Sequence, residues 1–449
     1  MIREAGQTGA EEAESVVRKA IPDEEARARR ERWSWVEPAV WTDRMLAALE
    51  NGVKGGSWYS LYDKVYAPST LEASWHQVQR NRGAAGVDGE SVERFAANAD
   101  RYLEELRVSL REGRYRPEGV RRVYLEKPGG GQRPLGIPTV KDRIVQGALK
   151  LVLEPIFERE FCAWSHGFRP RRGAKDALRE VNEGLKAGHT WVVDADLKSY
   201  FDTIPHDRLM ERIRERVRDG RVLELIERYL QQEVLDGLET WTPSQGSPQG
   251  AVLSPLLANL YLHEMDRTLG ERYRLTRYAD DFVVLCSTEE EAHAALAEIR
   301  TWVEENDLVL HPDKTHVGDC RQPGQGFDFL GYRFEAGRRW VRRKSARAIR
   351  EKIRQKTRRT RGNSMRQIVD DLNPMLRGWF GYFQHAHPWE HQNLDGFIRR
   401  RLRAIRRKQQ KRPGRGSTHA DHRRWPNAYF ADLGLFTLAT ARAQASQSR

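Results

Sequence analysis

Residues 191–202, WVVDADLKSYFD, and residues 273–286, YRLTRYADDFVVLC, decide the fold, because each places carboxylates at the end of an apolar run. The first stretch predicts a buried strand that ends at Asp196, and the second predicts two strands joined by a tight turn at Asp280 and Asp281. Taken alone, the acidic turn is as typical of a solvated surface turn as of a functional site. Its apolar flanks, and a second strand that also ends in acid and could lie alongside it, favour a site at the end of a core hairpin.

Clustered acids of this kind have a chemical consequence. Carboxylates that lie close together repel each other unless a proton or a cation neutralises them. Mg²⁺ prefers oxygen ligands and binds one or two carboxylates together with substrate phosphates. Two such ions about 4 Å apart stabilise both the attacking and the leaving oxygen of an in-line phosphoryl displacement. The two stretches therefore indicate nucleotidyl transfer.

The neighbouring residues predict how the strands are covered. Residues 251–266 have the length and periodicity of a helix, and residues 289–305 place apolar side chains on one helical face. The order of strand, helix, two strands and helix indicates an α+β sheet with helices on one face. Residues 120–136 predict a β-hairpin with a glycine-rich tip at 129–131.

The positive charge of the chain is concentrated in one segment. The 449 residues include 77 Lys and Arg against 64 Asp and Glu, a net charge of +13. Residues 338–412 contain 24 of those cations and 5 of those acids, so the remainder of the chain is mildly acidic. Two amphipathic helices are predicted there, one around Ile349 and Ile353 and one around Ile398 and Leu402, with polar faces that are almost entirely Arg and Lys. Such a segment predicts a polyanionic partner, most often nucleic acid.

Other features exclude several classes of protein. Cys162, Cys286 and Cys320 lie far apart without a CxxC motif or a nearby His pair, which argues against a zinc site and a disulfide framework. The histidines within 385–391 lack a carboxylate or Cys that would complete a metal site. No apolar run is long enough to span a membrane, and the charged N-terminus lacks the apolar core of a signal peptide. The sequence thus predicts a soluble intracellular protein.

Taken in order, the motifs resemble those of the reverse transcriptases that group II introns encode, which also act as maturases. The resemblance covers roughly residues 58–400 and rests on an ordered set of motifs rather than on the acidic turn alone. The motifs are NRGAAGVDG (81–89), RPLGIPTVKDRIVQGAL (133–149), SHGFRPRRGAKDAL (165–178), DLKSYFD (196–202), SPQGAVLSPLLANLYL (247–262), YADD (278–281), LHPDKT (310–315), FLGY (329–332) and LRGWFGYFQ (376–384).

The resemblance implies a right-hand polymerase fold of the α+β class, with fingers and an antiparallel palm sheet followed by an α-helical thumb, or maturase, domain. The expected parts are a partly disordered N-terminal extension (1–57), fingers with an extra N-terminal motif (58–190), the palm (191–335), the basic thumb (336–412) and a C-terminal tail (413–449). The tail has no CxxC pair or HNH-like cluster, so we expect no endonuclease domain, and it could hold a small DNA-binding remnant.

The resemblance also implies the catalytic centre, with two Mg²⁺ ions as cofactors. The expected metal ligands are Asp196, Leu197 through its backbone carbonyl, Asp280 and Asp281, and the three carboxylates are the expected catalytic residues. Asp194 and Asp202 do not match the ligand position, and we expect structural or supporting roles for them.

A second set of residues is expected to contact the incoming nucleotide or the template. These are Lys127, Arg133, Phe201, Gln249, Gly250 and Lys314. The first two flank the hairpin tip and match residues that grip the triphosphate, with a solvated tip as the alternative. Phe201 matches the steric gate that selects deoxynucleotides, a placement that a core Phe would share. Gly250 permits a close approach of backbone. Lys314 matches a possible general acid, although a Lys in a loop is usually just solvated.

The basic helices are expected to hold an RNA–DNA duplex and the intron RNA through phosphate contacts. The expected RNA-binding residues are Arg350, Lys352, Arg354, Lys356, Arg358, Arg377, Arg399, Arg400 and Arg403. The aromatic residues of 379–383 are expected to pack in the thumb core more than to stack on bases. The implied partners are group II intron RNA, an RNA template with a DNA primer, target DNA and dNTPs, in a bacterial cytoplasm.

Two alternatives remain open from the sequence. A domesticated or defence-associated reverse transcriptase would keep the catalytic core without a mobile intron, although the complete LRGWFGYF motif favours the intron interpretation. An RNA-binding splicing factor with a dispensable polymerase is the other alternative, and the complete set of acids and basic fingers residues argues against it.

Overall fold

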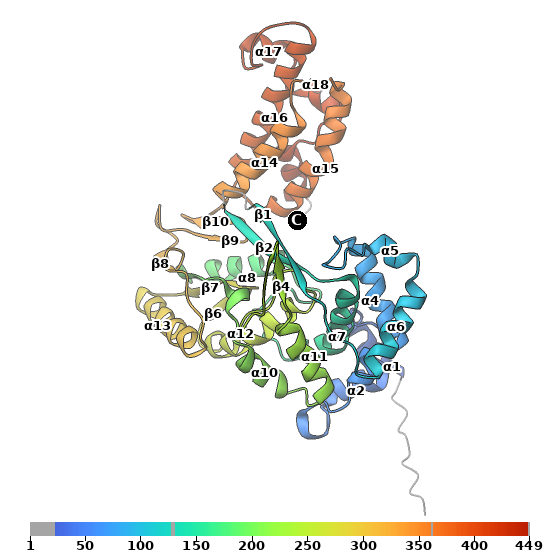
Figure 1. The fold of residues 1–449 in the computed structure, drawn as a ribbon. Helices are drawn as coiled ribbons and strands as arrows, with labels where there is room; N and C mark the ends of the chain where they lie inside the picture. Colours follow the sequence, from blue (N-terminus) through green and yellow to red (C-terminus); the bar gives the residue numbers. More distant parts are fainter. Residues whose placement is uncertain (1–22, 127–130, 361, 448–449) are drawn as a thin grey trace, which may run out of the picture.

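The computed structural model describes residues 23–126, 131–360 and 362–447. In Figure 1 the helices that follow residue 343 stand apart from the helices of the N-terminal part, and three β-sheets lie between and below them. The predicted mixture of an α+β polymerase core with a helical C-terminal region is confirmed by this arrangement.

The N-terminal helices pack around α7 (Val140–Glu158), which is buried along most of its length. Helix α4 (Pro68–Asn81) lies directly against it. Ser74 Oγ donates to the carbonyl oxygen of Ile144 at 2.7 Å, and a Cβ on Gly147 would lie 2.1 Å from that hydroxyl. The other elements of this group are α1 (Asp23–Arg32), α2 (Asp43–Asn51), the 3₁₀ helix η1 (Lys54–Gly56), α3 (Tyr62–Val65), α5 (Val92–Ala96) and α6 (Ala99–Arg111).

The first sheet contains the predicted hairpin. Strands β1 (Val120–Glu126) and β2 (Gln132–Ile137) pair antiparallel, which confirms the hairpin, while most of its tip lies outside the described residues. The sheet continues through β4 (Val234–Asp236) to β5 (Glu239–Trp241), in the order β2-β1-β4-β5.

The central sheet has the order β6-β7-β3-β8 and is antiparallel throughout. The apolar runs identified in the sequence form its middle strands, whose side chains are buried because both faces are covered. Its strands are β3 (Trp191–Asp196), β6 (Arg274–Tyr278), β7 (Asp281–Cys286) and β8 (His316–Asp319). The helices that connect or cover it are α8 (Ala174–Lys186), α9 (Tyr200–Thr203), α10 (His206–Arg214), α11 (Gly220–Leu230), α12 (Ser254–Gly270) and α13 (Glu289–Glu305).

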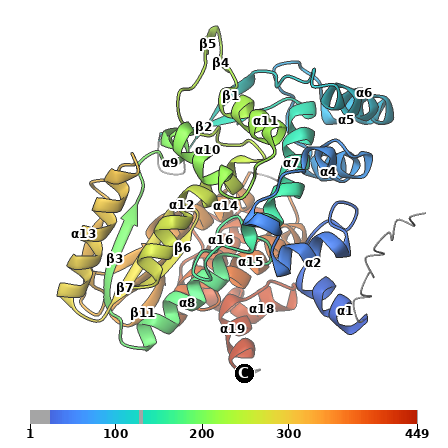
Figure 2. The ribbon, with the colours of Figure 1, turned by 90° about the horizontal axis from the view of Figure 1, so that it is seen from below.

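The expectation that helices cover one face of this sheet holds for α12 and α13 but is wrong for α8. Figure 2 shows α13 and α8 on opposite sides of β3 and β7. Val193 and Val284 belong to the core beneath α12 and α13, whereas Val192 and Val283 pack with Val181 of α8. The strands alternate apolar side chains on both faces, so the second face also requires a cover.

A small third sheet joins the palm to the C-terminal helices. It comprises β9 (Phe327–Phe329), β10 (Tyr332–Glu335) and β11 (Arg338–Val341), all antiparallel. The helices that follow are α14 (Arg343–Lys356), α15 (Met365–Phe383), α16 (Pro388–Gln409), α17 (His419–Arg424), α18 (Asn427–Asp432) and α19 (Leu438–Gln447). Their core is formed by the predicted apolar faces, Ile349 and Ile353 on α14 and Ile398 and Leu402 on α16.

The aromatic segment and the tail both contribute to packing. Phe383 is buried, and Trp379, Phe380 and Tyr382 pack against the same cores, as expected. Residues beyond 412 are not a separate unit, because side chains of 425–438 lie in one core with α14–α16.

Candidate active site and nucleic-acid interface

The acidic turn lies at the end of the β6–β7 hairpin, and its backbone is strained. Tyr278 pairs with Asp281, so Ala279 and Asp280 form the turn between the strands. Ala279 has a φ of +61°, a left-handed conformation that a residue with a Cβ rarely adopts. A Cβ on Gly167 would lie 2.2 Å from the backbone nitrogen of Ala279, so the chain at Gly167 packs directly against the turn. The surroundings, rather than local preference, therefore hold this conformation.

The buried guanidinium of Arg277 is hydrogen-bonded to the backbone of the same turn. Arg277 has no exposed surface, and its Nη1 donates to the carbonyl oxygen of Ala279 at 2.7 Å. Its charge is paired with the equally buried Asp266 on α12, with Nε donating to Oδ1 at 2.6 Å. Further donations reach Asn259 Oδ1 at 3.0 Å and Ser165 Oγ at 2.8 Å. A buried charge pair of this kind is stable only when its hydrogen-bonding groups are satisfied, so the network fixes the geometry of the turn.

The strand pairing brings the two acidic stretches together. Asp196, the last residue of β3, is the cross-strand partner of Asp281, the first residue of β7, and Asp280 precedes it in the turn. Directly paired residues have Cβ atoms about 5 Å apart. The expectation that a second acidic strand lies alongside the turn is confirmed.

The carboxylates of this cluster raise one another's pKa. Burial, followed by the charges of Asp280 and Asp196, raises the pKa of Asp281 to about 7. Burial and then Asp196 also raise the pKa of Asp280, although Arg133 and Arg277 oppose that rise. Burial, then Asp281, Asp328 and Asp196, raise the pKa of Asp194 to about 8. The cluster thus has more negative charge than its surroundings neutralise.

Lys314 supplies a cation to the cluster from the loop that precedes β8. Its Nζ lies 2.6 Å from Asp196 Oδ2, although the Lys side chain is more than half exposed. The loop is fixed beside the end of β3 by the backbone of His311, which donates to the carbonyl oxygen of Asp196 at 2.7 Å. The predicted Lys314 therefore lies at the acidic cluster, in contact with Asp196.

The donor set suits a divalent cation. Among the described residues, no group of three or more His, Cys, Asp or Glu is arranged to hold a metal ion by itself. Mg²⁺ does not need such a group, because it keeps several waters and is completed by substrate phosphates. Asp196, Asp280 and Asp281 are neighbouring oxygen donors, and burial raises the pKa of Asp280 and Asp281, whose protons a divalent cation would displace.

The other predicted nucleotide contacts lie on two elements that meet beside the acids. Arg133 is exposed on β2, and its charge lowers the pKa of Asp280, so the guanidinium acts on the cluster. Gln249 is half-buried, and its carbonyl oxygen accepts from the nitrogen of Gly136 on β2 at 2.7 Å. Gly250 has a φ of +106°, and a Cβ there would lie 2.6 Å from the carbonyl oxygen of Gly136. The close approach of backbone expected at Gly250 is therefore made to Gly136 on strand β2, in the fingers.

Phe201 and Lys127 complete the predicted nucleotide set. Phe201 is half-buried at the start of α9, with its ring 6.3 Å from Phe168 and edge-on to it. It packs against the core while part of the ring stays accessible, so the gate and core interpretations are both compatible with its position. Lys127 lies outside the described residues.

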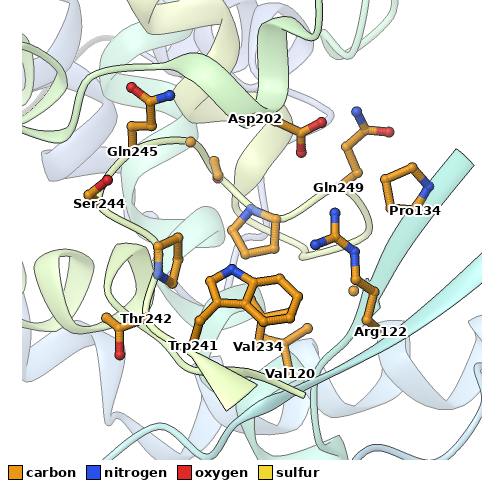
Figure 3. Close-up of a pocket in the computed structure, with 15 residues that line it drawn as sticks. Val120, Arg122, Pro134, Asp202, Val234, Trp241, Thr242, Ser244, Gln245 and Gln249 are labelled. Atoms are coloured by element: carbon orange, nitrogen blue, oxygen red, sulfur yellow. The ribbon is translucent and has the colours of Figure 1, made fainter. Parts of the chain in front are cut away.

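A cavity of about 410 Å³ lies beside the loop that carries Gln249 (Figure 3). It lies between the strands β1 and β2, the end of β5 and residues 242–249. Arg122, Trp241 and Asp202 line it together with Gln249, whereas Asp196, Asp280 and Asp281 do not. Asp202, which the motif comparison had set apart from the metal ligands, faces this cavity.

Eight of the nine predicted RNA-binding residues are at least partly exposed, seven on the C-terminal helices and Arg358 just after α14. Lys352 and Arg354 line a cavity of about 1270 Å³ between α14 and the third sheet. The same cavity is lined by five further cations that were not among the expected RNA-binding residues, Arg333, Arg342, Arg343, Lys344 and Arg347. This surface is open, positively charged and next to the palm, which suits a nucleic-acid backbone.

Arg403 is different, and its predicted role in binding RNA needs correction. Its side chain lies in the thumb core, and the residue is only 2% exposed. Nε donates to the carbonyl oxygen of Trp425 and Nη2 to Asn427 Oδ1, both at 2.9 Å. Its hydrogen bonds attach the tail to α16, so the guanidinium does not face solvent where a phosphate could reach it.

Arg277, Asp266 and Asn259 were not expected at the site from the sequence. A signal was present on α12, where Asn259 and Asp266 interrupt an apolar helix, but not on β6 (RLTRY), where Arg277 lies among other polar residues. Asn259 and Asp266 are seven residues apart, two helical turns, and therefore share a face of α12.

No helix in the described part of the chain is both long and apolar enough to cross a membrane.

Comparisons with known proteins agree with this geometry. Residues 125–334 match the reverse transcriptase (RNA-dependent DNA polymerase) family, and residues 346–425 match the group II intron maturase-specific domain. Protein YkfC of Escherichia coli K12 is 38% identical over 291 residues, which are 55% of this chain and 75% of YkfC. The group II intron-encoded protein LtrA of Lactococcus lactis is 35% identical over 210 residues, which are 46% of this chain and about a third (34%) of LtrA. A chain of a solved structure, the partial Cas6-RT-Cas1–Cas2 complex, is 24% identical over 55% of this chain and 41% of that one, with a TM-score of 0.35.

Proposed function

Because the chain belongs to the family of group II intron reverse transcriptases and maturases, we propose that it copies RNA into DNA at the acidic cluster and assists its intron RNA in splicing and retrohoming. The observation that carries the polymerase role is the pairing of Asp196 with Asp281 beside Asp280. The maturase-specific match, together with the basic surface of α14, supports the role in RNA binding.

In this proposal, Asp196, Asp280 and Asp281 hold two Mg²⁺ ions, with the Leu197 carbonyl as a further ligand. The ions, when bound, supply Lewis-acid stabilisation to the reacting phosphate oxygens. The protein holds the carboxylates in place through the strand pairing and through Arg277, which fixes the turn. Preorganised charge of this kind avoids reorganisation during the reaction.

The nucleotide contacts follow from the same placement. We propose that Arg133, with Lys127, binds the triphosphate, where charge-assisted contacts neutralise the negative charge that develops as pyrophosphate leaves. Phe201 limits the space at the sugar and thereby selects deoxynucleotides. Gln249 orients the nucleotide or the template, and Gly250 keeps that loop against β2. Lys314, already in contact with Asp196, donates a proton to the leaving group.

The thumb, in this proposal, binds the template–primer duplex and the intron RNA through Arg350, Lys352, Arg354, Lys356, Arg358, Arg377, Arg399 and Arg400. The relative in Escherichia coli supports a bacterial source, and we infer that the protein works in the bacterial cytoplasm. A domesticated reverse transcriptase without a mobile intron, and a splicing factor with a dispensable polymerase, are the competing functions.

Primer extension tests the polymerase role. On an oligo(dT)-primed poly(rA) template, the wild-type chain should incorporate dTTP when Mg²⁺ is present and stop when it is chelated. Asp280→Ala should abolish extension, and Asp100→Asn, an exposed acid on α6, should not. Full activity of the Asp280→Ala variant would refute the proposed site.

Splicing separates the competing functions. RNA transcribed from the DNA that flanks the gene should splice faster with the protein than without it, and Asp280→Ala should retain this effect. Extension without any splicing of flanking RNA would favour a domesticated enzyme. Splicing by a wild-type protein that cannot extend a primer would favour the splicing factor.

A further inference from the structure

The cavity beside the Gln249 loop is lined by residues to which the proposed polymerase reaction gives no role, apart from Gln249 itself. Its apolar lining is formed by Trp241, Val120 and Val234 together with the rings of three prolines. Its rim carries Asp202, Ser244, Gln245 and Gln249 (Figure 3), and all of these are neutral except the aspartate. An apolar cleft with a few convergent polar groups is the usual form of a small-ligand site.

The guanidinium of Arg122 is available to a ligand. Its Cζ lies over two aromatic rings, 5.2 Å from the ring centre of Trp241 and 5.9 Å from that of Tyr124. Arg122 makes no hydrogen bond or ion pair with a protein group among the described residues. Because Arg122 lines the cavity, a planar acceptor edge of a ligand there could accept from two of its donors.

The two charged residues that line the cavity favour a neutral base over a phosphate as its ligand. Of the described residues that line it, Arg122 and Asp202 are the two charged ones, and they have opposite signs. Burial raises the pKa of the Asp202 carboxyl, and Arg122 opposes that rise, so the two side chains act on each other across the cavity. A phosphate would be attracted by Arg122 and repelled by Asp202. A neutral ring with acceptors on one edge and donors on the other would satisfy both.

Hydrogen bonds and close packing hold the segments that line the cavity in place before any ligand binds. Gly246 has a φ of +88°, and a Cβ there would lie 2.8 Å from the backbone of Asp202. The nitrogens of Gly246 and Ser247 donate to the carbonyls of Ile204 and Phe201, both at 2.7 Å. Since these bonds tie residues 246–247 to the segment that carries Asp202, the ligand would enter a preformed site and cause little rearrangement.

We propose that this cavity binds one unpaired guanine base, with Arg122 donating to its acceptor edge, O6 and N7, and Asp202 accepting from its N1–H and amino group. Arginine pairs with O6 and N7 of guanine in the same bidentate way in protein–DNA complexes. Trp241 supplies the stacking surface, which is how unpaired bases are usually held. The site goes beyond the proposed polymerase, because it contains none of the catalytic acids and needs no metal.

Binding of short RNA in EDTA tests the site apart from polymerisation. The probes are uridine decamers with one central guanosine, adenosine or inosine, and anisotropy gives their affinity for the full chain. We expect the guanosine probe to bind about tenfold more tightly than the adenosine probe, the discrimination of one good bidentate contact. Arg122→Ala should remove this preference, and Asp202→Ala, which removes the acceptor, should remove the difference between guanosine and inosine.

Two controls make the result decisive. Arg101→Ala removes another arginine that lies over an aromatic ring, 4.9 Å from Tyr102 and outside the cavity, and should keep the full preference. A probe with 6-thioguanosine should photocrosslink to residues that line the cavity. Displacement of the probe by GMP would show that the free nucleotide suffices, whereas a preference that GMP does not affect would show that the base is bound as part of a strand. Equal affinity for guanosine and adenosine, or crosslinks on the thumb alone, would overturn the proposal.

Discussion

The palm and the thumb carry charges of opposite sign and hold them in opposite ways. In the palm, negative groups are drawn together at the ends of two strands, and the guanidinium of Arg277 that holds their turn is fully buried and paired. In the thumb, positive groups such as Lys352 and Arg347 line an open cavity at the surface. A reaction needs charges at fixed positions, whereas the hold on a long polyanion needs many charges and tolerates variation in the position of each. The four predictions below test this difference, beginning with the largest expected effect.

Asp196→Asn removes one acid of the paired cluster and keeps its shape. If the palm depends on fixed charges, the rate of primer extension should fall about three orders of magnitude, because a metal ion stabilises the transition state by several kcal/mol. The dissociation constant for the template–primer duplex should stay unchanged in a filter-binding assay. A similar loss from any single exposed thumb Lys would remove the distinction between the two regions.

Arg277→Met breaks the buried pair and leaves Asp266 without a counter-charge. Loss of one partner of a buried pair costs about 3 to 5 kcal/mol, so urea unfolding should show a large fall in the free energy of unfolding. The double variant Arg277→Met/Asp266→Leu should recover part of that stability. Recovery of stability without recovery of primer extension would show that the network positions the catalytic turn as well as stabilising the fold.

The raised pKa of Asp281, about 7, predicts a pH effect in the palm alone. Below pH 7 this carboxyl is protonated in the folded, metal-free chain, whereas in the unfolded chain it loses its proton near pH 4. The folded state binds more protons between these values, so this group makes the metal-free protein less stable as the pH rises towards 7.

Mg²⁺ must displace the same proton, and its affinity should therefore increase up to about tenfold per pH unit below the pKa. Thermal melting at pH 5.5 to 8.5, with and without Mg²⁺, measures both effects. The Asp281→Asn variant should show a weaker pH dependence of both its melting temperature and its affinity for Mg²⁺. An unchanged profile in that variant would assign the proton to another group, such as Asp194.

Lys352→Gln/Arg354→Gln should have the smallest effect, confined to RNA binding. The slope of log affinity against log salt concentration should fall by about two, because each phosphate contact contributes roughly one unit. Stability and Mg²⁺ dependence should stay the same. As a matched control, the same change at Arg101 on α6, an exposed arginine of the fingers, should leave the slope unchanged.

Much of this arrangement was predictable because the relevant patterns are local. Apolar runs that end in acid gave β3 and β7, and helical periodicity around Ile349 and Ile398 gave the thumb core. The packing of helix α8 on the second face of the central sheet was not predicted, since periodicity within a strand does not show what packs on each side. The role of Arg403 was predicted wrongly for a similar reason. In an arginine-rich helix, the sequence alone does not show which guanidinium faces a neighbouring segment.

The packing of the tail has a consequence for the order in which the protein folds during synthesis. Asp395 of α16 accepts from the backbone nitrogens of Leu438 and Ala439, and Asn373 of α15 bonds to both Gly434 and Phe436. The thumb core therefore cannot close until these residues have left the ribosome, by which time the fingers and palm have been free to fold. During translation the catalytic core is thus complete while the thumb still lacks part of its interior, and nascent chains stalled near residue 412 should present a protease-sensitive thumb on a resistant core.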